Sequence, residues 1–152
     1  MGSSMLFAAS VRAFFTLIGI ATAAELNQAD WLIDATSGCR IPNPNPQENE
    51  AVTWSGGCQN GIAEGRGVLQ WFAHAASTDR YEGELHEGKA NGHGVLTTRT
   101  GDRYDGEWRD GKANGLGRVV TSNYNYTGIW SDGCSRDGNK TIGVGRDPAS
   151  CP

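Results

Sequence analysis

Proline is scarce in this chain, and no long hydrophobic run occurs in it. Only 5 of the 152 residues are proline and there is no G-X-Y period, which excludes a collagen-like triple helix. The longest uninterrupted apolar stretch, which follows Arg12, spans about 12 residues, whereas a membrane-spanning helix needs about 20. The length itself leaves room for one ordinary domain.

Clusters of basic residues and of metal ligands are also missing. The 13 Lys and Arg residues are scattered among 17 Asp and Glu residues, so the formal net charge is −4 and no basic patch favours nucleic acid as a partner. There is no C-x₂-C pair, and His74, His86 and His93 stand apart, which argues against a zinc site. Neither a G-x-S-x-G motif nor a phosphate-binding glycine loop occurs. The sequence therefore predicts no catalytic residue, no metal and no cofactor.

Residues 1–24 have the organisation of a secretory signal. Arg12 supplies the positive charge, an apolar run follows, and small residues at 21–24 provide a cleavage site after Ala23 or Ala24. We therefore expect an exported protein, periplasmic or secreted. Cleavage would leave 12 basic residues against 17 acidic ones and a net charge of −5, because Arg12 is the one charged residue of the segment.

Four cysteines become interpretable once export is expected. In an oxidising compartment an even set predicts two disulfides, for which three connectivities exist. Closeness in the sequence favours Cys39–Cys58 and Cys134–Cys151, with one bond near each end of the mature chain.

Glycine is the abundant residue, and its positions reveal a repeat. The chain contains 22 Gly, roughly twice the usual share. Clear copies of one pattern begin at Tyr81 and Tyr104, a partial copy begins at Tyr126, and a variant copy begins at Trp54. A fixed period of this length indicates an array in which each unit packs mainly on its neighbours.

The spacing within one copy predicts a β-hairpin. Tyr104, Gly106 and Trp108 share one face of a strand, while the residues between them point to water. Asp110-Gly111 then favours a tight turn, because glycine accepts positive φ. One hairpin is marginal alone, so we expect an all-β fold in which stacked hairpins form one elongated antiparallel sheet.

The aromatic residues of the copies form a ladder along one face of this sheet. Its members are Trp54, Tyr81, Tyr104, Trp108, Tyr126 and Trp130. Two interpretations stay open: the rings are the core that the sheet must bury, or part of the face is a binding groove for a peptide, a glycan or an apolar segment. Of these rings, Trp130 at the end of the array is expected to have the best chance of exposure.

The pattern Y-x-G-x-W-x-x-G-x-x-x-G-x-G resembles the MORN repeat (membrane occupation and recognition nexus). The copies at Tyr81 and Tyr104 match it nearly throughout, and the resemblance covers about residues 52–138. The copy at Trp54 has Cys58 in place of the second aromatic residue, and the copy at Tyr126 loses the final G-x-G. The resemblance implies a scaffold for proteins or an association with a membrane surface.

Four segments follow from these patterns. They are a signal peptide (1–24), an N-terminal cap with a Pro-rich segment (25–53), the repeat array (54–134) and a C-terminal cap or tail (135–152). The Pro-rich residues 41–46 are expected to form neither a helix nor a central strand. Within the first cap, residues 29–34 suit either a helical turn or a short strand.

The function expected from these features is that of an exported, non-enzymatic interaction module that binds a protein partner. A peripheral lipid-associating protein is the alternative, and a protein that binds or acts on glycans is a further one. The open end of a stacked sheet can also pair with a second copy, which makes a homodimer an additional expectation.

Overall fold

The computed structural model describes residues 31–152, so the predicted signal segment (1–24) lies outside the described residues. The elements are β1 (Trp31–Ile33), β2 (Arg40–Pro42), β3 (Glu50–Trp54), β4 (Gly57–Gln59), β5 (Ile62–Ala73), β6 (Ala76–His86), β7 (Lys89–Thr97), β8 (Arg103–Arg109), β9 (Lys112–Val120), β10 (Asn125–Trp130), β11 (Cys134–Asp137), β12 (Lys140–Gly143) and the 3₁₀ helix η2 (Pro148–Ser150). Among these elements there is no helix with the length and apolar character needed to cross a membrane.

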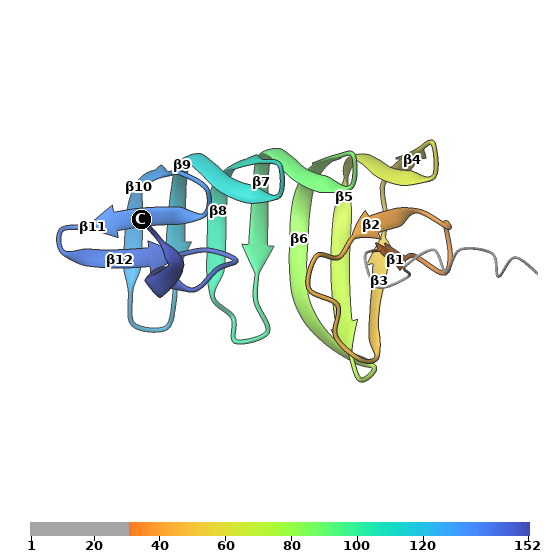
Figure 1. Ribbon diagram of the computed structural model, residues 1–152, viewed down its shortest axis with the longest axis horizontal. Coiled ribbons are helices and arrows are strands. Elements are labelled where there is room, and N and C mark those ends of the chain that lie inside the picture. Colours follow the sequence, from red (N-terminus) through yellow and green to blue (C-terminus); the bar gives the residue numbers. More distant parts are fainter. Residues whose placement is uncertain (1–30) are drawn as a thin grey trace, which may run out of the picture.

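Ten of the strands form one elongated sheet (Figure 1). Strands β5 to β10 follow one another in chain order, each antiparallel to the next. β3 and β4 both pair with the other edge of β5, and β2 joins β5 through the single parallel bridge Arg40↔Ile62. β11 and β12 form a separate two-stranded sheet. The prediction of an all-β chain built on one elongated antiparallel sheet is confirmed.

The hairpin turns fall at the residue pairs that the sequence singled out. Asp110 and Gly111 have φ values of 49° and 78°, and such a turn with positive φ at both positions matches the twist of the paired strands. Both residues also have positive φ in the turns at Asn60–Gly61, Glu87–Gly88 and Asp132–Gly133. In addition, the Gly111 N–H donates to the carbonyl oxygen of Ala90 at 2.9 Å, so the turn is tied to the preceding hairpin.

Alternation along the strands places the rings and the glycines on the inner face. In β8, Tyr104, Gly106 and Trp108 are buried, whereas Glu107 is exposed. Glycines lie directly opposite one another across the sheet, in the row Gly67, Gly83, Gly94, Gly106, Gly117 and Gly128. A Cβ atom at Gly106 would lie only 2.5 Å from the Cα atom of Gly117. The glycine row therefore lets the strands carry rings across this face without a steric clash.

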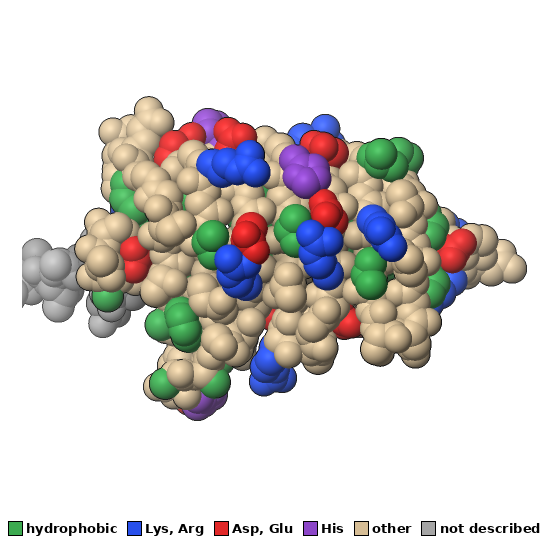
Figure 2. Space-filling model, turned by 180° about the vertical axis from the view of Figure 1, so that it is seen from behind, with side chains coloured by type: hydrophobic (Ala, Val, Ile, Leu, Met, Phe, Trp, Pro, Cys, Tyr) green, Lys and Arg blue, Asp and Glu red, His purple; other side chains and the backbone are tan. Residues whose placement is uncertain are grey.

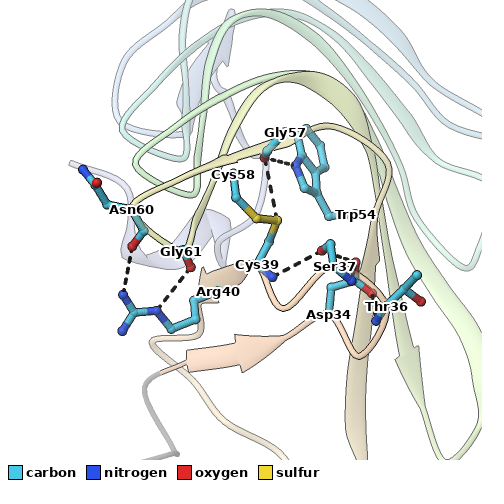
Figure 3. The surroundings of a disulfide bond; sticks show 10 residues. All are labelled: Asp34, Thr36, Ser37, Cys39, Arg40, Trp54, Gly57, Cys58, Asn60 and Gly61. Carbon is cyan, nitrogen blue, oxygen red and sulfur yellow. Dashed lines mark hydrogen bonds between the residues drawn. A yellow bond between two sulfur atoms is a disulfide. The ribbon is translucent and has the colours of Figure 1, made fainter.

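The N-terminal cap is closed by the disulfide Cys39–Cys58, as predicted from sequence distance (Figure 3). Its Cα atoms are 5.7 Å apart. Beside it, the Trp54 indole N–H donates to the carbonyl oxygen of Gly57 at 2.8 Å. Burial alone would raise the pKa of Asp34, but hydrogen bonds from the hydroxyl of Ser37 and nearby backbone amides hold it below its ordinary value. The cap is thus fixed to the first hairpin by a covalent bond and by polar contacts.

The Pro-rich segment differs from its prediction at its first two residues. Ile41 and Pro42 end the short strand β2, which lies between β1 and β5. This is possible because β2 pairs with β5 only at Arg40. Pro42, which has no backbone N–H, therefore does not have to donate a hydrogen bond to β5. Within the preceding stretch, Trp31–Ile33 forms a strand and not a helical turn.

The C-terminal cap folds back over the inner face of the sheet (Figure 1). The hairpin β11–β12 and η2 lie in front of the last strands, and Cys134–Cys151 closes this segment with Cα atoms 5.8 Å apart. The loss of the G-x-G motif after Tyr126 has a visible consequence here. The chain leaves the main sheet after β10, and β11 pairs with β12.

The extra residues in the first copy lengthen one hairpin. β5 and β6 contain 12 and 11 residues, and their turn is formed by His74 and Ala75, both with positive φ. The β5–β6 hairpin consequently extends beyond the neighbouring ones, at the lower edge of the sheet in Figure 1.

Candidate functional site

The six residues of the predicted aromatic ladder all lie on the inner side of the sheet, and most of them are core. Five are buried, with exposed fractions of 4% for Trp54, 2% for Tyr81, 2% for Tyr104, 7% for Trp108 and 1% for Trp130, and Tyr126 is half-buried. The expectation that Trp130 is the most accessible is wrong. Its ring lies between those of Tyr104 and Tyr126, and its indole N–H donates to the carbonyl oxygen of Gly117 at 3.1 Å.

The rings contact one another edge to face along the array. Trp108 lies 5.4 Å from Tyr81 and 5.2 Å from Tyr104, measured between ring centroids, with interplanar angles of 85° and 90°. Tyr104 in turn lies 5.2 Å from Trp130. This geometry is favourable for aromatic pairs, since the positive edge of one ring meets the negative face of the next.

The polar ends of the buried rings are satisfied by backbone carbonyls in a repeating way. The Trp108 indole N–H donates to Gly94 O at 3.1 Å, which matches the bond of Trp130 to Gly117 one repeat later. The Tyr104 hydroxyl donates to Glu107 O at 3.1 Å, and Tyr81 makes the equivalent bond. Burial raises the pKa of Tyr81 to about 12, so its hydroxyl remains a donor at neutral pH. Every polar ring atom in this set has a structural partner, which leaves none of them for a ligand.

A groove lies where the C-terminal cap meets the inner face of the sheet. Its volume is about 310 Å³. The residues that line it include Leu96, Tyr104 and Val119 from the sheet, Ile142 and Val144 from the cap, and the polar residues Thr98, Asp102, Thr121, Asn123, Tyr124 and Lys140. The groove therefore has apolar surfaces from two directions and polar groups around them, a composition typical of a binding site.

One wall of the groove links the β9–β10 loop to the C-terminal hairpin. The Lys140 Nζ atom lies 3.5 Å from the centroid of the Tyr124 ring, and the Tyr124 hydroxyl donates to Asp137 Oδ2 at 2.8 Å. Burial and the hydrogen bond to the Asp137 carboxylate raise the pKa of Tyr124 to about 12. These contacts hold the cap against the sheet beside the groove.

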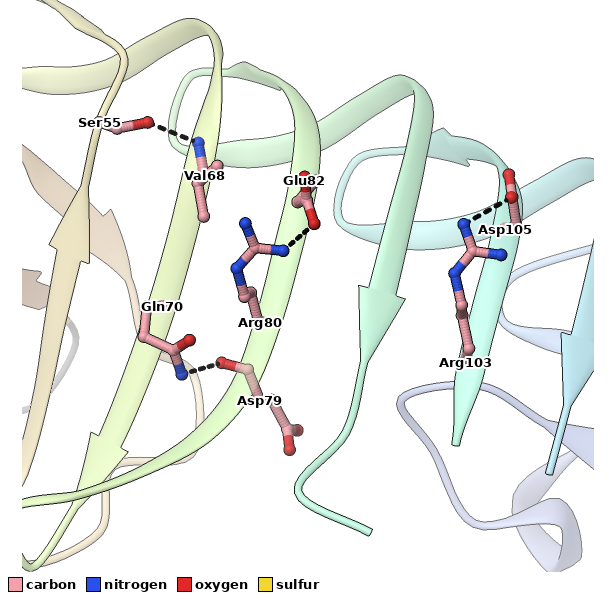
Figure 4. Close-up of polar contacts among 8 residues, drawn as sticks. All are labelled: Ser55, Val68, Gln70, Asp79, Arg80, Glu82, Arg103 and Asp105. Atoms are coloured by element: carbon pink, nitrogen blue, oxygen red, sulfur yellow. Dashed lines mark hydrogen bonds and ion pairs between the residues drawn. The ribbon is translucent and has the colours of Figure 1, made fainter. Parts of the chain in front are cut away.

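The outer face of the sheet is polar and charged over most of its area (Figure 2). Arg80 pairs with Glu82, and one repeat later Arg103 pairs with Asp105 at 2.9 Å (Figure 4). His93 also reaches Asp105, at 3.0 Å. Most of these side chains are substantially exposed, so the pairs contribute little to stability and serve to keep this face in water.

Titratable groups on the described surface do not converge. Between residues 31 and 152 no group of three or more His, Cys, Asp or Glu residues is placed to hold a metal ion. Glu84 and Glu107, which occupy equivalent strand positions, are both exposed on the outer face. The sequence left open a groove on the face of the aromatic ladder, and Tyr104 does line this one, but its cap wall was not anticipated, because that wall comes from a segment with no repeat pattern.

Comparison with known families identifies the array. The MORN repeat family model matches residues 53–72, 81–103 and 104–125. These ranges correspond to the copies that begin at Trp54, Tyr81 and Tyr104. A comparison with curated proteins found no match. MORN repeats generally act as modules that interact with proteins or membrane lipids. The chain is a MORN-repeat protein.

Proposed function

We propose that this protein is an exported, non-enzymatic interaction module, and that its groove receives a few side chains, apolar ones among them, of a protein partner. The observation that carries the proposal is the groove itself. It combines apolar residues of the sheet, such as Leu96, with apolar residues of the cap, such as Ile142, and it is bordered by Asp102 and Lys140. A hollow of about 310 Å³ suits a few side chains of a partner better than a large substrate.

The cap gives this surface the rigidity that recognition needs. The Cys134–Cys151 disulfide closes the cap, and the contacts of Tyr124 hold it against the sheet. A preorganised surface loses less conformational entropy on binding, which favours affinity. Both disulfides also support export, because such bonds persist in oxidising compartments.

Photo-crosslinking within the producing cells tests the proposal. A photoreactive amino acid is placed at Asn123 on the border of the groove, and the matched control is placed at Gln59, an exposed residue at the other end of the array. We expect a discrete adduct of higher mass from position 123 and none from position 59. The Lys140→Glu variant should weaken that adduct. No adduct at position 123, or the same adducts from both positions, would contradict the proposal.

Peripheral membrane association is the second candidate, because MORN repeats also bind lipids. A negative net charge opposes attraction to anionic lipid, so such binding would rely on exposed aromatic groups. Flotation with anionic vesicles at low salt separates the two functions. Co-flotation that is unaffected by Lys140→Glu would favour lipid binding over the groove.

A further inference from the structure

Strand β12 has one edge without a partner strand. Its other edge pairs with β11 across the two-residue turn 138–139, and the pair nearest the turn is Asp137↔Lys140. In such a hairpin the pair next to the turn is hydrogen-bonded and the following pair is not. Thr141 belongs to that following pair, so its backbone N–H and C=O point away from β11. Among residues 31–152, neither of these two groups has a hydrogen-bond partner.

Contacts on the far side of the hairpin agree with this orientation. Arg136 lies directly opposite Thr141, and its carbonyl oxygen accepts a hydrogen bond from the Tyr126 hydroxyl at 2.7 Å, on the side away from β12. Two positions earlier in β11, Cys134 exchanges both of its backbone hydrogen bonds with Ser131, at 2.9 Å each. The edge of β11 is thus satisfied within the chain, whereas the edge of β12 at Thr141 is not.

This free edge lies along the groove of the proposed function. Residues 140–145, which include the whole of β12, line the groove on one side. The lining also includes Thr98 and Asp102 from the loop before β8, and Thr121 and Asn123 from the loop before β10. In Figure 1 these two loops are at the lower edge of the main sheet, and β11 lies above β12. The groove therefore has a strand edge on one side and loops on the other.

Unpaired backbone groups beside apolar side chains suit an extended peptide. We infer that an extended segment of the protein partner enters the groove and pairs with β12 at Thr141 as one added strand. Its backbone provides an acceptor for the Thr141 N–H and a donor for the Thr141 carbonyl oxygen, which is the usual basis of recognition by strand addition. This inference rests on the proposed function and specifies how the groove binds its partner.

The neighbours of Thr141 determine which segment fits. Side chains alternate along paired strands, so the residues of the segment opposite Lys140 and Ile142 turn toward the main sheet, as those two side chains do. Ile142 is 8% exposed and forms part of the apolar wall. Lys140 carries a positive charge and lies over the ring of Tyr124. We expect an apolar residue of the segment beside Ile142 and an acidic residue beside Lys140, with one residue between them.

A second copy of the folded chain is a poorer occupant of this edge. In a second copy β12 is joined to β11 and is bordered by the same loops. These loops keep the β12 edges of two folded chains apart, whereas a single extended segment can lie between the edge and the loops. The occupant is therefore a flexible terminus or loop of another protein.

Two variants of Thr141 test the pairing. Thr141→Pro removes the N–H that the added strand needs, and proline is tolerated at an edge position whose N–H is not used within the sheet. Thr141→Val is the matched control, because it keeps the N–H and the β-branched shape. With the photoreactive amino acid at Asn123, we expect Thr141→Pro to reduce the adduct about tenfold and Thr141→Val to preserve it. Near-UV circular dichroism verifies that both variants are folded.

Hydrogen exchange in the purified, oxidised natural protein gives a readout that needs no variant. The Thr141 amide should exchange much faster than the amide of Ile142, which alternation directs toward Ser135 of β11. Mass spectrometry of the adduct from position 123 identifies the crosslinked segment. We expect that segment to come from another protein and to contain an apolar and an acidic residue separated by one position.

An undiminished adduct in the folded Thr141→Pro variant would overturn the inference and leave the proposed function intact. The absence of any adduct from the natural protein would contradict both. Slow exchange of the Thr141 amide in the purified protein would show that the edge is already occupied, and it would overturn the inference alone. A crosslinked segment from a second copy of this chain would also exclude the partner inferred here.

Discussion

The ring of Tyr104 lies edge-on against the ring of Trp130, with centroids 5.2 Å apart and planes at 80°. Tyr104 belongs to β8 and Trp130 to β10, so this contact spans β9 and joins two successive repeats. Trp108 makes the same kind of contact with Tyr81 one repeat earlier. The stability of each hairpin thus depends on rings supplied by its neighbours, as expected for a repeat array.

Removal of the Trp130 ring should destabilise the whole array. For Trp130→Ala we expect a loss of about 3–5 kcal/mol in the free energy of unfolding, because a fully buried indole and its contacts disappear. Urea denaturation followed by near-UV circular dichroism measures this loss. Leu116→Ala is the control, since an exposed residue should change stability by less than about 0.5 kcal/mol. Equal effects of the two variants would show that Trp130 is not core.

A methyl group added to the glycine row should be poorly tolerated. At Gly117 a Cβ atom would overlap the ring of Tyr104, so Gly117→Ala should cost about 1–3 kcal/mol through overpacking. Gly57→Ala is the matched control, because the nearest atom to its added Cβ lies at an ordinary 3.6 Å. Thermal unfolding of the two variants compares their melting temperatures. A lower value for Gly117→Ala shows that the row needs glycine because side-chain rings lie close to its backbone. Similar melting temperatures would contradict the close approach.

The C-terminal disulfide should stabilise the cap and the groove beside it. Replacement of Cys134 and Cys151 by Ser should lower the free energy of unfolding by about 3 kcal/mol, because the bond closes a loop with a sequence separation of 17. Urea titrations of the variant and of the natural protein under oxidising conditions measure the difference. The adduct from Asn123 should also decrease in the variant. Free thiols at Cys134 and Cys151 in the natural protein would contradict the proposed stabilisation of the cap by a disulfide.

An ion pair between His86 and Glu64 makes one contact between repeats dependent on pH. The His86 Nδ1 atom lies 2.9 Å from Glu64 Oε1, and this hydrogen bond raises the pKa of His86 above its usual 6.5. The same bond, with that from the Glu87 amide, lowers the pKa of Glu64 below 4.5. The stabilisation from His86 is therefore complete below pH 6.5 and is lost as the pH rises through the raised pKa. The contribution of Glu64 is complete above pH 4.5 and is lost as the pH falls through the lowered pKa.

Nuclear magnetic resonance titration of the His86 imidazole measures this coupling directly. We expect a pKa above 6.5 in the natural protein and a return toward 6.5 in the Glu64→Gln variant. His86 is exposed and Glu64 is half-buried, so the pair contributes little to stability and the titration is a more sensitive readout than the total stability. An identical His86 pKa in both proteins would show that the pair does not form in solution.

Local patterns in the sequence were sufficient to predict the array. The alternation around Gly106 determines which face is buried, and pairs such as Asp110–Gly111 determine where strands reverse. Sequence distance also identified the partners of both disulfides correctly. These features depend on contacts within one hairpin or with the adjacent one, which is why spacing alone reveals them.

Features that depend on packing outside the repeat were not predictable in this way. His74–Ala75 forms a turn with positive φ at both positions although alanine rarely adopts that conformation, and we attribute this to the paired strands on either side, which determine its geometry. The position of β11–β12 over the inner face depends on contacts of Tyr126 with Ser135 and Arg136, far from any repeat pattern. The groove forms against this hairpin, so it could not be recognised from spacing.

Hydrogen exchange of the tryptophan indole protons tests most directly whether the aromatic ladder is the core of the array. The indoles of Trp108 and Trp130 donate to backbone carbonyls within the sheet, whereas Trp71 is only half-buried. We predict that the first two protons exchange only when the whole protein unfolds and that the Trp71 proton exchanges much faster. Exchange of Trp108 or Trp130 as fast as that of Trp71 in the folded protein would mean that this face is open, and it would contradict the account.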